Sequence, residues 1–208
     1  MENTVLIIAA LLTSTLSAMI GMGGGIILLG LMAIFIPDGY IVIALHGMIQ
    51  LIGNGTRTYV FKNAIKKEIV TKYFSGSLIG LSISSIIVII LIHLYNVETA
   101  NEIRFDYLKP LIGIYIIWFI YLRKKRQADK SGNFFLVGII GGLTSIFIGA
   151  VGPLIAPFFL RDQLTKENII ANKAACQIIT HLGKVPIFVY FFNLNYFEYS
   201  TILIPLMI

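Results

Sequence analysis

Two sets of polar side chains share one spacing, and each set lies in an otherwise apolar stretch of the chain. The first set is His46, Gln50, Asn54 and Arg57, and the second is Lys173, Gln177, His181 and Lys184. Corresponding members are 127 residues apart throughout. Because a helix turns by about 100° per residue, this spacing places each set within about 80° of one helix face. The pattern predicts two helices that each carry a polar stripe, with donor groups that suit an anion.

A break in an apolar segment precedes each polar stripe. The first break is Gly21, Met22, Gly23, Gly24 and Gly25, inside an uncharged run at 4–36, and the second is Gly149, Ala150, Val151, Gly152 and Pro153. Each glycine costs a helix interior about 1 kcal/mol relative to alanine, so a continuous helix is not expected there. Inside a membrane, such irregular backbone is tolerated only where it is buried in protein or lines a cavity. The two breaks therefore predict a site.

A helix that restarts at such a break offers unpaired N–H groups and about half a positive charge at its first turn. Pro153 suits that first turn because its missing N–H is no loss there. Two facing helix starts would form a cradle for an anion. The alternative is that the glycines only allow close helix packing, as we expect for Gly138, Gly141 and Gly142. A proline at one break, and breaks in equivalent places, favour the site.

The stripe residues also have structural interpretations. Arg57 and Lys184, near helix ends, could snorkel to the interface, and His46 could be a satisfied core histidine. A lone glutamine or asparagine in a membrane helix usually makes an interhelical hydrogen bond. Recurrence of the whole stripe favours a shared polar cavity over these separate roles.

Composition and charge place the chain in a membrane. Hydrophobic residues make up 57% of the 208 residues, charged residues 12%, and the mean hydropathy is +0.88. The net charge of +6 arises largely from basic clusters at 62–72 and 123–130, each beside an apolar segment. That distribution is the positive-inside pattern, so we expect a lipid bilayer and no nucleic acid as partner. The single cysteine, Cys176, excludes an intrachain disulfide.

The apolar segments predict an all-α, polytopic transmembrane protein with two internal repeats, each opening with a glycine-broken helix. We expect one transmembrane domain over 1–208, with repeats at about 1–122 and 132–208. The expected segments are a broken one at 4–36, helices at 40–61, 70–94 and 107–122, a second broken segment at 134–160, and helices at 168–192 and 196–208. By this count the second repeat lacks the fourth span that the first repeat has, and whether the chain, which stops at Ile208 inside an apolar run, is truncated stays open.

The orientation of the repeats depends on the broken segments. If each segment crosses the bilayer once, the basic clusters and the amino terminus lie in the cytoplasm and the repeats are parallel, which the charges favour. If each segment instead folds back as a re-entrant pair, the repeats can be inverted.

Missing motifs narrow the chemistry. The ten acidic residues lie in connections or at helix ends, so a cation pathway, which usually relies on buried carboxylates, is poorly served. The sequence contains no HExxH zinc motif, no GxSxG elbow and no Walker loop. We therefore predict neither an enzyme nor a bound metal or cofactor.

The first glycine break, the following turn, the polar helix and the second break together resemble the TauE/SafE family of membrane permeases, the sulfite exporter group. Gly21, Gly23, Gly24 and Gly25 fit the G-x-G-G-G break of that family, whereas Val151 occupies a position where a glycine is common. The resemblance covers nearly the whole chain. It implies transport or export of a small sulfur-containing anion such as sulfite or a sulfonate, and it implies that the breaks form substrate-site backbone.

The leading hypothesis is a secondary transporter in the cell membrane that moves a small anion by alternating access. The expected substrate-site residues are Gly21, Gly23, Gly24, Gly25, Gln50, Asn54, Arg57, Gly149, Gly152, Pro153, Gln177, His181 and Lys184. His46 or His181 would carry a coupled proton, because imidazole titrates near neutral pH. A passive anion channel and a non-transporting membrane scaffold are the alternatives, and the oligomeric state, including a homodimer, stays open.

A direct test changes the first break. We expect Gly24→Leu to abolish uptake or efflux of labelled sulfite in proteoliposomes, because the side chain would cover the helix start. Transport equal to the unmodified protein would remove the site from the break.

Overall fold

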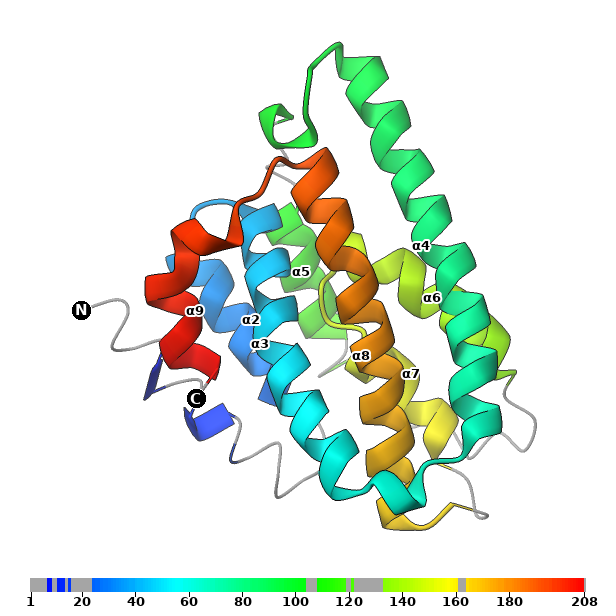
Figure 1. Cartoon of the computed structure of the whole chain (residues 1–208). Helices are drawn as coiled ribbons and strands as arrows, with labels where there is room; N and C mark the ends of the chain where they lie inside the picture. The colour runs from blue at the N-terminus through cyan, green and yellow to red at the C-terminus, as the bar shows by residue number, and fades with distance from the viewer. Residues whose placement is uncertain are drawn as a thin grey trace.

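The computed structural model describes residues 7–8, 11–13, 15, 24–103, 108–118, 121, 133–160 and 164–207. All regular structure within these ranges is helical, as predicted (Figure 1). The α-helices are α2 (Gly24–Phe35), α3 (Gly39–Val60), α4 (Lys67–Tyr95), α5 (Leu108–Ile117), α6 (Phe134–Phe147), α7 (Gly152–Phe159), α8 (Lys166–Phe191) and α9 (Ser200–Met207). Short 3-10 helices are η1 (Lys62–Ala64), η2 (Ala100–Glu102) and η4 (Tyr196–Tyr199). Helices α4 and α8, with 29 and 26 residues, are long and apolar enough to cross a bilayer.

The two polar helices, α3 and α8, pack side by side and antiparallel (Figure 1). Near the start of α3, the Ile43 carbonyl accepts a hydrogen bond from Lys184, late in α8. Just after the end of α3, the Ala64 carbonyl accepts one from Asn168, near the start of α8, at 2.7 Å. The start of each helix therefore lies beside the end of the other. If the stripes are a repeat, a two-fold axis that relates them lies perpendicular to these helices, which is the inverted arrangement and not the parallel one.

Helices α4 and α6 pack so closely that only glycine fits at four positions where their backbones meet. Gly76 and Gly80 of α4 face Gly138 and Gly142 of α6, and a Cβ at any of them would collide with backbone atoms of the facing helix. Ser84 Oγ donates to the Leu143 carbonyl at 3.0 Å. Small residues let membrane helices approach in this way, so the prediction that Gly138 and Gly142 serve packing is supported.

The second broken segment folds back on itself. The rings of Phe134, at the start of α6, and Phe159, at the end of α7, are 5.0 Å apart. The chain reverses through Gly149, whose φ of +83° is in the left-handed region that favours glycine. The expectation that this segment crosses the bilayer once is therefore wrong: α6 and α7 form a hairpin, as the re-entrant alternative required. The matching part of the first broken segment lies mostly outside the described residues.

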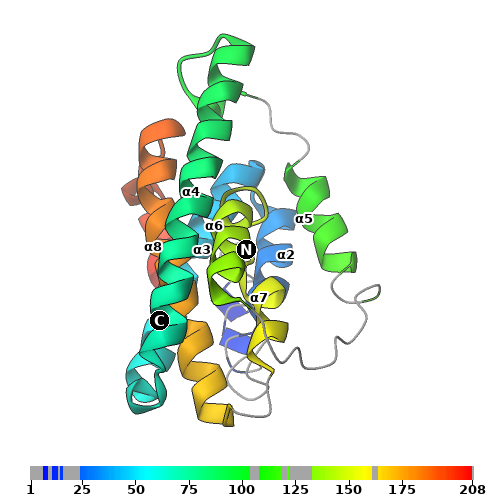
Figure 2. The same cartoon turned by 90° about the vertical axis from the view of Figure 1, so that its right-hand side faces the viewer.

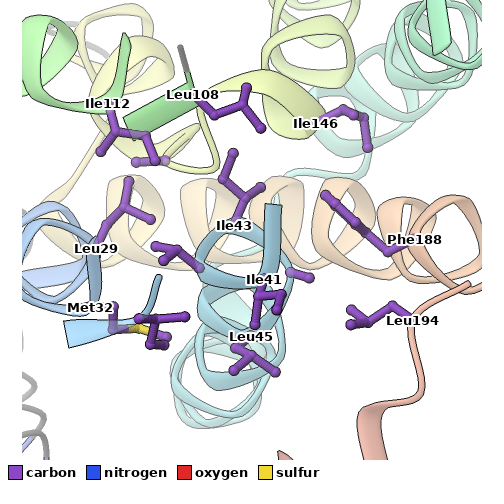
Figure 3. Packing of buried hydrophobic residues seen from close by; sticks show 14 of the residues in the cluster. Leu29, Met32, Ile41, Ile43, Leu45, Leu108, Ile112, Ile146, Phe188 and Leu194 are labelled. Atoms are coloured by element: carbon purple, nitrogen blue, oxygen red, sulfur yellow. The ribbon is translucent and has the colours of Figure 1, made fainter. Parts of the chain in front are cut away.

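The tip of the α6–α7 hairpin is held in the centre of the helix bundle. A Cβ at Gly149 would lie 3.1 Å from the Ile43 side chain. Tyr115 of α5 donates from its hydroxyl to the Ala150 carbonyl at 3.0 Å, which satisfies a buried acceptor at the turn. Figure 3 shows the apolar side chains of α2, α3, α5, α6 and α8 that converge around Ile43, among them Leu29, Ile112 and Ile146.

Lysines are more numerous at one end of the bundle. The end where α3 leads into α4 and where α8 begins carries Lys62, Lys66, Lys67, Lys72 and Lys166, together with Glu68 and Glu167. The opposite end, where α3 begins and α8 ends, carries Asp38 and Lys109, and the loop after α4 at that end carries Glu98 and Glu102 (Figure 2). The amino terminus and the second basic cluster, 123–130, lie outside the described residues.

The hairpin predicts which sites share a side of the membrane. We expect Asn133→Cys and Leu160→Cys to react with an impermeant maleimide from the same side as Lys62→Cys, and Glu98→Cys to react from the opposite side. Cys176 is buried and gives no background. Labelling of positions 133 and 160 from opposite sides would contradict the hairpin.

Candidate functional site

Lys184 is the centre of a buried polar cluster between α3 and α8. Its side chain is fully buried, and Nζ donates a hydrogen bond to the Ile43 carbonyl at 2.9 Å. The lysine reaches α3 because residue 47 is glycine: a Cβ there would lie 2.7 Å from Nζ. An ammonium group carries three donors, and the Ile43 carbonyl uses one of them. A buried cation is costly unless other groups compensate its charge.

Two histidines lie beside Lys184. The rings of His46 and His181 are 6.3 Å apart and nearly perpendicular, and both side chains are buried. Among the residues that the structure describes, neither ring nitrogen of His181 has a hydrogen-bond partner. Buried polar atoms are rarely left unpaired, because each costs about 1–3 kcal/mol. A ring with two unpaired nitrogens beside a buried ammonium group can receive a polar ligand.

His46 connects the two glycine breaks. Its Nε2 lies 2.8 Å from the Gly25 carbonyl in the first turn of α2, which makes Nε2 the protonated nitrogen, since a carbonyl only accepts. The backbone of Gly149, at the tip of the α6–α7 hairpin, also lies near the ring. One imidazole of the first polar stripe thus lies against both breaks, in contact with the region around Lys184.

Each break also packs against a glutamine of the stripe that follows it. A Cβ at Gly25 would lie 2.9 Å from Gln50 Nε2, and a Cβ at Gly152 would lie 2.5 Å from Gln177 Nε2. Both pairs keep the offset of 127 residues found in the sequence. Glycine at positions 25 and 152 therefore leaves room for the glutamine amides. The packing of these amides explains the two glycines, in addition to the role that a ligand site would give them.

A second polar cluster lies further along the same interface. Asn54 is fully buried and accepts a hydrogen bond from Arg57 Nη1 at 3.3 Å. No described residue forms a hydrogen bond with the amide nitrogen of Asn54. Lys173 of α8 is 6% exposed and lies within electrostatic range of Arg57. The polar residues of the stripes are thus divided between two places.

The structure brings some predicted site residues together and leaves others apart. Gly25, His46, Gly149, His181 and Lys184 meet in one region, while Asn54 and Arg57 lie in the second cluster. Pro153 is in the first turn of α7, as predicted, and Gly24 begins α2. Gly21 and Gly23 lie outside the described residues. Their assignment to a substrate site stays a prediction.

The sequence did not predict two components of the cluster around Lys184. The Ile43 carbonyl is a backbone atom in a hydrophobic residue, so no residue type signals it. Gly47 does carry a signal, because a glycine in mid-helix next to the polar stripe marks a close approach. The equal spacing of the stripes relates His46 to Lys173 in sequence. The antiparallel packing places it beside His181 instead.

The cluster around Lys184 offers donors and positive charge. Between residues that the structure describes, the one ion pair joins Lys72 to Glu68 at 2.7 Å on the surface. The described part of the chain also holds no group of three histidine, cysteine or acidic side chains placed to bind a metal ion. Ammonium and imidazole groups without a nearby carboxylate complement an anion.

The burial of Lys184 predicts a stability effect. We expect Lys184→Met to raise the melting temperature by about 2–8 °C in detergent, because an apolar side chain of similar size removes a buried charge. Lys166→Met, on the same helix but exposed, is the control and should change it by less than about 2 °C. A clear decrease for Lys184→Met would mean that the lysine mainly holds α3 to α8.

Comparison with known proteins assigns the chain to a family. The family model described as sulfite exporter TauE/SafE matches residues 6–208, which is nearly the whole chain. The comparisons found no match among curated proteins and none among solved structures. The match covers both glycine breaks and both polar helices, and it agrees with the resemblance seen in the sequence. The chain therefore belongs to the TauE/SafE sulfite exporter family, whose members are integral membrane transporters.

Proposed function

We propose that this protein is a secondary transporter that moves a small oxyanion, such as sulfite or a sulfonate, along the interface between α3 and α8. The observation that carries the proposal is the fully buried Lys184, whose Nζ donates to the Ile43 carbonyl and lies beside His181. Both ring nitrogens of His181 lack a hydrogen-bond partner within the described part of the chain. An anion there would supply the missing charge and the missing acceptors together.

The surrounding elements would assist the anion. Helix α7 begins at Gly152 beside the hairpin tip, and the positive end of its dipole favours a negative ligand. The amides of Gln50 and Gln177 would add hydrogen bonds once they move away from the glycines that they now contact. In the proposed transport cycle, the present arrangement, with these groups buried and packed against one another, would be a closed conformation.

Coupling and orientation follow from the same groups. His46 or His181 would carry a coupled proton once the site opens to water, because an imidazole ring nitrogen can take up and release a proton. The end rich in lysine, with Lys62 and Lys67, would face the cytoplasm by the positive-inside rule. Export of an anion from the cytoplasm would then begin at that end.

The test measures flux of labelled sulfite in proteoliposomes. We expect saturable, counterflow-competent transport by the wild-type protein and at least a tenfold loss of rate in Lys184→Met, since the anion loses its central cation. Lys166→Met is the matched control and should transport like the wild type, because Lys166 is exposed at the start of α8.

Other results would contradict this function. Flux that never saturates and shows no counterflow would indicate a passive channel. Transport at the wild-type rate by a folded Lys184→Met protein would show that the anion does not bind at this cluster. Flux of sulfite and of sulfonates that is no faster than in protein-free liposomes would leave the proposed substrate class without support.

A further inference from the structure

The donor groups between α3 and α8 form two separate clusters. The first contains His46, His181 and Lys184, and the second contains Asn54, Arg57 and Lys173. Along α3, His46 and Asn54 are eight residues apart, which corresponds to about 12 Å at 1.5 Å per residue. His181 and Lys173 are separated by the same number of residues on α8. The two clusters are therefore at different depths along the interface.

A single small anion cannot contact both clusters. Charge-assisted hydrogen bonds have donor–acceptor distances of about 2.7–2.9 Å, so a sulfite-sized ion bound to Lys184 is out of reach of Arg57. Each cluster has its own buried polar atoms without partners: both ring nitrogens of His181 in the first, and the amide nitrogen of Asn54 in the second. Each also has its own cationic side chains, so each can compensate an anion independently.

The glutamines lie between the two clusters in sequence on both helices. Gln50 is four residues from both His46 and Asn54, and Gln177 is four residues from both Lys173 and His181. Each amide is held against the glycine at the start of α2 or α7. An anion that passes from one cluster to the other along the interface must therefore pass the level of the glutamines.

We propose that the α3–α8 interface contains two oxyanion subsites in series, one formed by His46, His181 and Lys184 and the other by Asn54, Arg57 and Lys173. This inference rests on the proposed transport function and deepens it. The subsites accept a singly or doubly charged oxyanion of sulfite size. They differ in chemistry, because the first contains two imidazoles and the second contains a guanidinium that stays charged at all physiological pH values.

The test counts bound anions by equilibrium dialysis of purified protein against radiolabelled sulfite. We expect two equivalents per chain for the wild type, and one for Lys184→Met and for Arg57→Met. The double variant should bind none. Lys166→Met, outside both clusters, should bind two. Arg57→Lys keeps the charge and should retain a second equivalent, which separates lost binding from a failure to fold, as does a cooperative melting transition for each variant.

The outcomes separate this inference from the transport function. One equivalent in the wild type that Lys184→Met and Arg57→Met both abolish would mean a single site, which overturns the two subsites but leaves transport intact. Two equivalents in either single variant would also overturn the assignment. No bound sulfite in the wild type, together with no flux, would remove the transport proposal itself.

Discussion

The direction in which α3 and α8 pack determines which polar groups can act together. Because the helices are antiparallel, Lys184 reaches the Ile43 carbonyl and His46 meets His181. A parallel pair with the same sequence would place His46 level with Lys173 and Asn54 level with His181. The observed direction instead produces two clusters of different composition from stripes that are similar to each other.

Close packing elsewhere supports this arrangement. The glycines of α4 and α6 bring two backbones together, so α6 is held firmly along α4. The hairpin tip then lies against Ile43, and Tyr115 satisfies the Ala150 carbonyl there. These contacts fix the position of Ile43, and the glycine at position 47 leaves space for the Lys184 side chain, so Lys184 can be buried there. Close packing of small residues holds α4 against α6, while several buried polar atoms are left without a hydrogen-bond partner among the described residues.

The sequence predicted the helices well because apolar length and polar spacing are local properties. Helices α3, α4 and α8 begin and end within three residues of the expected positions. The pairing of each break with a glutamine is consistent with the repeat seen in the sequence. The hairpin was only an alternative, since hydropathy does not distinguish a helix that crosses from one that returns. The division into two clusters depends on which residues of α3 and α8 are level, and spacing within each helix contains no information on that register.

The left-handed turn at Gly149 also limits how the bundle can move. Helix α6 cannot slide or tilt on α4 without breaking the close backbone contacts along its length, and α7, with eight residues, is joined to α6 through the turn at Gly149. Phe159 and Val151 of the α7 segment are buried in the same core cluster as Phe134. The hairpin is therefore fixed at its base, at its corner and along α4, so a movement that uncovers Lys184 must either carry the hairpin and α4 together or separate α3 from α8.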